Sequence, residues 1–232
     1  MISLLFAAAT FAALASPQAE SGDSSLEGAG KLAPLGVPAG ALAEIGRTLL
    51  LDEPGDGRTW ARGPQWKASF GDEGFTYIPF FGSDVPQNFP IQFNLKGAAI
   101  GGENLELGPR ERYRSDGAVT LDRGALREVY HLEQDTVEQT FVIDTLPSSG
   151  ALTLELAVET ELLASYAKGG GINFSNDYGH VHYGSAIAVD ANGAVFHVEE
   201  VLEHDVLRLH LPEASVAAVA LPLVIDPILS TF

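Results

Sequence analysis

The sequence contains no cysteine. This absence excludes disulfide bonds, thiolate metal sites and a cysteine nucleophile. A secreted chain of this composition must therefore be stabilised by its apolar core. The chain has 232 residues, 46% of them hydrophobic, which is enough to bury a sizeable core in one large or two small domains.

Basic residues are also scarce. Lys and Arg number 13 against 31 Asp and Glu, which gives a formal net charge of −18. A surface this acidic repels phosphate backbones and anionic headgroups. We therefore expect neither nucleic acid nor a membrane surface among the partners of this protein.

The common catalytic motifs are missing as well. There is no G-x-S-x-G elbow, phosphate-binding loop, HExxH motif or dinucleotide fingerprint, and no repeat with a period of about 20–50 residues. The adjacent pair Glu199 and Glu200 cannot act together, because neighbouring residues of a strand point to opposite faces. The sequence therefore predicts a protein that is not an enzyme and needs no cofactor.

The chain has no apolar run of the about 20 residues that a transmembrane helix needs. The shorter run inside Met1–Ala19 is followed by small residues and fits a signal peptide, although no Lys or Arg precedes it. A membrane anchor or a buried helix is the alternative for this segment. We expect a signal peptide over residues 1–19, a flexible leader over 20–57 and a β-sandwich domain over 58–232, secreted or at the cell surface.

Alternation of apolar and polar residues is the clearest signal present. The stretch Leu126–Thr160 reads as a meander of three consecutive strands, in which Leu152, Leu154, Leu156 and Val158 share one face. A period of two means one buried and one solvated surface, which is typical of antiparallel sheets. The same alternation turns Gln139 inward, where we expect its amide to be hydrogen-bonded in the core.

The predicted fold is therefore an all-β antiparallel β-sandwich, enlarged to about a dozen strands. Residues 41–51 form either the one short helix or a first strand. Further strands are expected at 60–70, 75–81 and 216–225, with a loop at 162–171. The Asn192-Gly193 pair between alternating segments predicts a hairpin.

Aromatic residues are dense between residues 60 and 81, and they support two interpretations. Exposed Trp60, Trp66 and Tyr77 would form a platform for sugar rings, and the domain would then bind carbohydrate. Alternatively, these bulky side chains fill the gap of about 10 Å between two packed sheets. The second interpretation is favoured.

The segment from Pro109 to Arg114 holds the one basic cluster. In an extended strand Arg110, Arg112 and Arg114 project to one side. They could bind a carboxylate-bearing partner or a neighbouring domain. Pairing with nearby Asp and Glu residues on a solvated strand face is the favoured alternative.

His180 and His182 form an H-x-H pair, which places both imidazoles on the same face of a strand. With a third ligand they could bind Zn²⁺, although surface or structural histidines are the favoured reading. The run from Asp190 to Gly193 resembles the opening of a calcium loop, but its twelfth position is Val201 and not Glu, so the hairpin is preferred.

From about Tyr77 onward the order of landmarks resembles a β-sandwich domain near the N-terminus of large secreted bacterial proteins. In those proteins it precedes β-propeller (FG-GAP-like), metal-binding-motif or Ig-like repeats. The resemblance is carried by Val137–Phe141, by Val189–Gly193 and above all by the terminal PLVIDPILSTF. It transfers no catalytic residue. The chain stops at Phe232 without repeats, so it would be a free-standing or truncated version, or one fragment.

The leading functional prediction is a non-catalytic extracellular structural or interaction module that contacts other domains. The first alternative is a carbohydrate-binding module with extracellular glycans as partners. The second is a sugar-active or metal-dependent enzyme that uses the face of His180 and His182.

Overall fold

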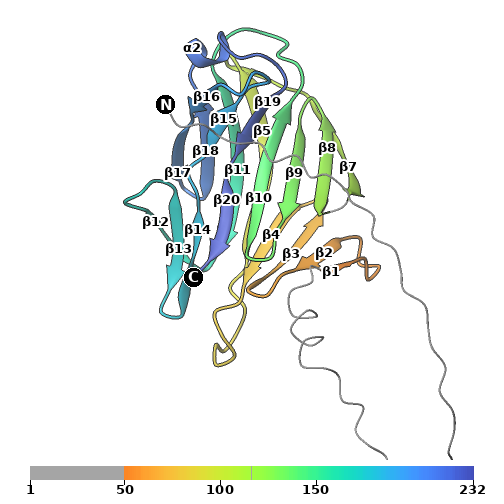
Figure 1. The fold of residues 1–232 in the computed structure, drawn as a ribbon, viewed down its shortest axis with the longest axis vertical. Helices are drawn as coiled ribbons and strands as arrows, with labels where there is room; N and C mark the ends of the chain where they lie inside the picture. The colour runs from red at the N-terminus through yellow and green to blue at the C-terminus, as the bar shows by residue number, and fades with distance from the viewer. Residues whose placement is uncertain (1–49, 116) are drawn as a thin grey trace, which may run out of the picture. The chain divides into compact units, whose positions relative to one another are not determined.

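The computed structural model describes residues 50–115 and 117–232, which hold twenty strands and one short helix (Figure 1). The strands form two antiparallel sheets of nine and eleven strands. The predicted all-β antiparallel fold is therefore confirmed, with more strands than the dozen expected. The predictions for residues 1–49, including the signal peptide, lie outside the described residues.

Sheet A has the strand order β1-β2-β3-β4-β5-β11-β18-β17, with β6 paired to β5. Its members are β1 (Leu50–Asp52), β2 (Thr59–Arg62), β3 (Trp66–Gly71), β4 (Gly74–Pro79), β5 (Ile91–Ile100), β6 (Glu103–Asn104), β11 (Leu152–Thr160), β17 (Glu199–Glu203) and β18 (Val206–Leu211). Because β1 pairs with β2, the sheet begins before residue 58, the start expected for the domain.

Sheet B is centred on β10, which pairs with β9 on one side and with β20 and β19 on the other. Its members are β7 (Leu107–Ser115), β8 (Ala118–Gly124), β9 (Arg127–Leu132), β10 (Thr136–Ile143), β12 (Leu163–Tyr166), β13 (Ile172–Asn176), β14 (Gly179–Tyr183), β15 (Ile187–Val189), β16 (Val195–His197), β19 (Leu223–Asp226) and β20 (Ile228–Thr231). Beyond β20 and β19 the sheet divides into two arms, β14-β13-β12 and β15-β16.

The core lies between the two sheets and is rich in aromatic rings. Tyr130 of sheet B contacts Phe70 and Phe75 of sheet A, with ring centroids 4.9 and 4.7 Å apart. Tyr183 of sheet B stacks on Phe93 of sheet A at 5.2 Å. All five side chains are fully buried, so they fill the space between the sheets as large sandwiches require.

Three expectations about single segments were wrong. Strands β9 and β10 lie in sheet B but β11 lies in sheet A, so the three strands of 126–160 are not one meander. Residues 60–70 form two strands, β2 and β3, because the chain turns at Gly63 and Pro64. Residues 162–171 contain strand β12.

The fourth difference concerns the apolar run at 216–225, expected as a strand. It begins at the end of helix α2 (Glu213–Val216), and only Leu223–Asp226 is extended. Apolar content without a period of two does not specify a strand. No helix within the described residues is long and apolar enough to cross a membrane.

Candidate functional site

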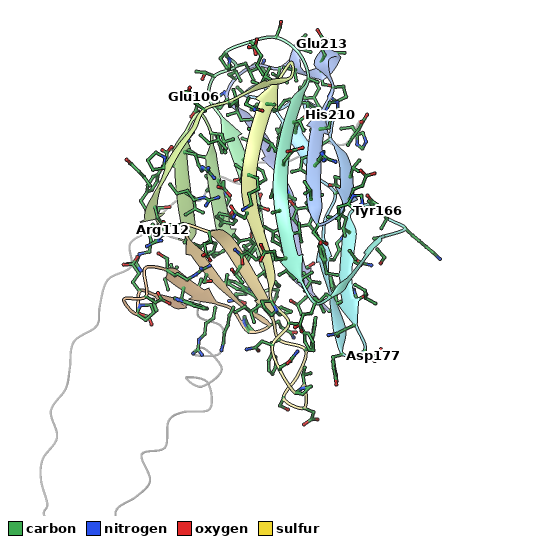
Figure 2. All side chains as sticks on the ribbon, turned by 180° about the vertical axis from the view of Figure 1, so that it is seen from behind. Glu106, Arg112, Tyr166, Asp177, His210 and Glu213 are labelled. Carbon is green, nitrogen blue, oxygen red and sulfur yellow. The ribbon has the colours of Figure 1, made fainter. Side chains whose placement is uncertain are left out.

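Figure 2 shows the outer face of sheet A, seen from behind the view of Figure 1. The strand register places a row of side chains across this face. Trp60 pairs with Ser69, Ser69 with Thr76, Thr76 with Gln92, and Gln92 with Glu159. Directly paired residues of antiparallel strands share a face. Their chain neighbours are buried, apart from the half-buried Thr160, so these five residues, the polar row, lie on the face that points away from the core.

Arg58 holds the middle of the polar row in place. Its Nε donates to Ser69 Oγ at 3.0 Å and its Nη2 donates to Thr76 Oγ1 at 3.1 Å. Its Nη1 lies 3.8 Å from Glu73 Oε2. The indole N–H of Trp60 donates to Asp56 Oδ2 at 2.8 Å, which fixes the ring and lowers the pKa of Asp56. The tryptophan end and the centre of the row are thus ordered without a ligand.

The polar row opens into a groove of about 350 Å³ at its other end. The groove is lined by Thr76, Gln87, Asn88, Pro90, Gln92, Glu159, Thr160 and Glu161. Gln87 Nε2 donates to Glu161 Oε2 at 2.9 Å, which orients both side chains. Apart from Pro90, the lining is therefore made of amides, hydroxyls and carboxylates, and it contains no basic residue.

Aromatic rings gather where the loop after β4 meets the β13–β14 turn and the last residue. We call this group, Phe80, Phe81, Phe89, Tyr178 and Phe232, the aromatic end. Phe80, Tyr178 and Phe232 are 54%, 50% and 67% exposed. Phe89 links the loop to the turn, with ring centroids 6.4 Å from Phe81 and 5.9 Å from Tyr178.

Local sequence explains how these rings come together. Gly179 follows Tyr178, and a Cβ there would lie 2.6 Å from the ring of Phe81 and 2.9 Å from the Phe232 carbonyl oxygen. Only glycine lets the loop and the last strand approach so closely. Phe232 also exchanges two backbone hydrogen bonds with His180 and stacks on its imidazole, with centroids 5.1 Å apart.

Two further grooves of about 270 Å³ each lie at the aromatic end. One is lined by Gln65, Phe80, Phe81, Gly82, Tyr178 and Phe232, and the other by Pro79, Phe80, Phe81, Gly82, Ser83, Val85, Gln87 and Asn88. They share Phe80, Phe81 and Gly82. The second also shares Gln87 and Asn88 with the groove of the polar row, so the two surfaces adjoin.

A buried polar chain crosses the core of sheet B. Tyr130 donates to Glu128 Oε2 at 2.9 Å, Gln139 Nε2 donates to the Tyr130 hydroxyl at 3.2 Å, and Tyr183 donates to Gln139 Oε1 at 3.3 Å. Burial raises the pKa of both tyrosines, so both hydroxyls stay protonated and able to donate. The inward orientation and core hydrogen bonding predicted for Gln139 are confirmed.

Glu128 at the end of this chain has no exposed surface. Arg110 Nε and Arg123 Nη1 lie 3.5 and 3.8 Å from its Oε1. Burial raises the pKa of Glu128 and outweighs the two arginines, which lower it. The group is enclosed by protein on every side, and we assign it to the stability of the sandwich and not to a reaction.

The outer face of sheet B carries a pair of neighbouring carboxyl groups, Glu138 and Asp226. Partial burial, the charge of Glu138 and a hydrogen bond with Glu138 together raise the pKa of Asp226 to about 7, and burial has the largest effect. Neither residue lines any of the three grooves described above.

Comparisons with known proteins found no matching family model, no similar curated protein and no similar solved structure. The side chains and their geometry are the basis on which a function is proposed below.

The three aromatic candidates, Trp60, Trp66 and Tyr77, differ in their exposure to solvent. Trp66 is 1% exposed and Tyr77 is fully buried, so neither presents a ring to a ligand. The Trp66 indole N–H donates to the Gln134 carbonyl at 3.1 Å, and the Tyr77 hydroxyl is 2.7 Å from Thr231 Oγ1. Trp60 alone lies partly exposed on an outer face, at the end of the polar row.

The three arginine candidates share one face of β7, as predicted, but each contacts a different group. Arg110 binds Glu128 and Asn94 Oδ1, the latter at 2.8 Å. Arg112 donates to the Phe70 carbonyl at 3.3 Å, and Arg114 lies 3.6 Å from Glu53. Arg110 and Arg112 therefore join the edge of sheet B to sheet A.

The histidine candidates lie on one face of β14, opposite the buried Val181 and Tyr183. Their rings have different partners, because His180 stacks on Phe232 and His182 Nδ1 is 2.8 Å from Asn173 Oδ1. Among the described residues no three His, Asp or Glu side chains are placed to hold a metal ion.

The sequence alone did not identify most residues of the polar row or of the aromatic end. Trp60, Gln92 and Glu159 belong to different strands, and only the register brings them into line. The exposed Phe80 and Tyr178 lie in a loop and a turn, where alternation does not distinguish buried from exposed rings. Tyr178 carried one usable signal, because it sits in a polar turn, Asn176-Asp177-Tyr178-Gly179.

Proposed function

We propose that the protein is a non-catalytic extracellular module that binds another protein domain through its aromatic end. The observation that carries this proposal is the exposure of Phe80, Tyr178 and Phe232 side by side with two grooves. Contiguous exposed aromatic surface is typical of protein interaction sites, where such rings insert into pockets of the partner.

The fixed positions of the rings at the aromatic end support the same function. Its rings are held by the β13–β14 turn and by the pairing of Phe232 with His180. A surface that is ordered before binding loses little conformational entropy when a partner docks. The extracellular location is supported by the signal-like Met1–Ala19, and the modular role by the resemblance to sandwich domains of large secreted proteins.

Site-specific photo-crosslinking tests the proposal. A photo-reactive phenylalanine analogue at position 178, in the protein secreted by its natural host, should crosslink to one discrete protein. Phe80→Ser together with Phe232→Ser should reduce that product several-fold. The same analogue at position 113 is the control, because Tyr113 is 46% exposed but lies on β7. Equal products at both positions would contradict the proposal.

The non-catalytic part is tested separately with panels of glycoside, ester and peptide substrates. We expect no turnover above the blank. Hydrolysis that disappears in Glu159→Gln or Glu138→Gln would show that the protein is an enzyme.

Carbohydrate binding is the second candidate function, and the polar row favours it. A fixed, partly exposed tryptophan stands in line with an arginine, an amide and a carboxylate beside a groove. Flat apolar rings and convergent hydrogen-bonding groups are what a polyhydroxylated ligand needs. This surface adjoins the aromatic end but contains none of its exposed rings.

A further inference from the structure

We propose that the outer face of sheet A binds a glycan chain without acidic groups, lying across the strands from Trp60 to the groove beside Gln92. The inference rests on the second candidate function and names its site and ligand class.

The direction follows from the register. The polar row takes one residue from each of β2, β3, β4, β5 and β11. Neighbouring strands lie about 4.8 Å apart, so the row spans about 19 Å perpendicular to the strands. Only an elongated ligand contacts Trp60 and Glu159 at once, which favours a chain of several sugar rings over a single sugar.

Trp60 supplies the apolar contact at one end. Its indole is held by the bond to Asp56, and part of the ring remains exposed on the outer face. A rigid indole offers a large apolar surface at little entropic cost. The apolar C–H face of a sugar ring is the matching surface.

Arg58 supplies donors at the centre. A guanidinium has five N–H donors, and the contacts to Ser69, Thr76 and Glu73 do not use them all. Its side chain is 23% exposed, so it is reachable from solvent. Ligand hydroxyls can accept from Arg58, while Gln92 can both donate and accept.

The charge of the lining excludes acidic ligands. Glu159 and Glu161 line the groove and no basic residue does, while Arg58, which donates to Thr76 of the lining, is already within 3.8 Å of Glu73. The whole chain carries a formal charge of −18. Carboxylate or sulfate groups on a glycan would therefore be repelled at the groove, whereas hydroxyl groups can donate to both glutamates.

Affinity electrophoresis with the full chain tests the inference. The probes are soluble neutral polysaccharides and polysaccharides that bear uronate or sulfate groups. We expect retardation by at least one neutral polymer and by none of the acidic ones. Trp60→Ala and Gln92→Ala should each weaken binding about tenfold, and Trp60→Phe should retain most of it.

Thr153→Ala is the matched control, because Thr153 lies on the same outer face of β11 as Glu159 but six residues away. Its variant should bind as the wild type does, and urea midpoints verify that every variant is folded. Binding of neutral polymers that both Trp60→Ala and Gln92→Ala leave unchanged would overturn the site but not carbohydrate binding. Preferred binding of acidic polymers would overturn the ligand class. No retardation by any polymer would overturn the inference and the second candidate function together.

Discussion

At the scale of the residue, the most unusual group is the carboxyl pair of Glu138 and Asp226. The pKa of Asp226 is raised to about 7 from an ordinary value of 3.8, first by burial and then by Glu138. The folded protein therefore holds this proton more tightly than the unfolded chain does. Because the unfolded chain releases this proton at lower pH, the free energy of unfolding should fall as pH rises from about 4 to about 7.

We predict that Asp226→Asn flattens this part of the pH dependence. The variant has no carboxyl group to ionise at this position, so its stability relative to the wild type should increase as pH rises from about 4 to 7. Urea unfolding at several pH values measures the difference.

Asp84→Asn, a change in an exposed loop, is the control and should keep the wild-type slope. Glu138→Gln should flatten the slope in part, because it removes the second cause of the shift. Parallel slopes for Asp226→Asn and the wild type would rule out this account.

The orientation of single residues was predictable where alternation is strict. Gln139 points inward, as its neighbours Val137 and Phe141 require. Its partners were not predictable, since Tyr130 and Tyr183 lie 9 and 44 residues away in the chain. The exposure of Trp60 and Trp66 was not predictable either. Trp60 lies on the outer face of β2 and Trp66 on the buried face of β3.

At the scale of the element, Asp190 organises the turn between β15 and β16. Its Oδ1 accepts from the backbone N–H groups of Asn192 and Ala194 at 2.8 Å each, and its Oδ2 accepts from Ala220 at 3.0 Å. These bonds lower the pKa of Asp190, the bond from Ala220 most strongly. The carboxylate thus connects the predicted hairpin to the segment before β19.

We predict that Asp190→Ala lowers the stability of the fold, because three backbone donors lose their acceptor. A carboxylate with a lowered folded pKa stabilises the fold above its unfolded pKa and ceases to do so as pH falls through its folded value. The difference in urea midpoint from the wild type should therefore shrink in acid. Asp190→Asn, which keeps one acceptor oxygen, should lose less, and equal losses would count against this role.

Elements with an alternating pattern were predicted correctly, and the exceptions have physical causes. The Asn192-Gly193 hairpin was confirmed, with Gly193 at φ +79° as such a turn requires. The apolar run after Val216 has no period, and Pro222 interrupts it. Strand β12 was missed because all four of its residues are exposed, so it has no buried face to detect.

At the scale of the whole molecule, a contact at the β2–β3 hairpin joins sheet A to sheet B. The turn between β2 and β3 lies against the Gln134 carbonyl of the β9–β10 turn, which accepts from the Trp66 indole. A Cβ at Gly63 would overlap that carbonyl oxygen and lie 2.5 Å from Trp66 Nε1. Glycine at position 63 is therefore needed for the two sheets to meet here.

We predict that Gly63→Ala destabilises the protein by about 1–3 kcal/mol, the usual cost of overpacking. Chemical denaturation with tryptophan fluorescence as the signal measures this loss, since Trp66 is at the contact. Gly97→Ala is the matched control, because a Cβ at Gly97 meets nothing within 4 Å. Equal stability of the two variants would disprove the role of this contact.

Alternation by itself determined the class of this fold. Period-two patterns specify strands with one buried face, and the lack of cysteine specifies that an apolar core must hold them. Tertiary structure decided which sheet each strand joins. The segment between β10 and β11 could return the chain to the same sheet or carry it to the other one, and in this fold it leads from sheet B to sheet A. Tertiary structure also decided the candidate sites. The polar row exists only through the pairing of five strands, and the aromatic end only where loop, turn and last residue meet.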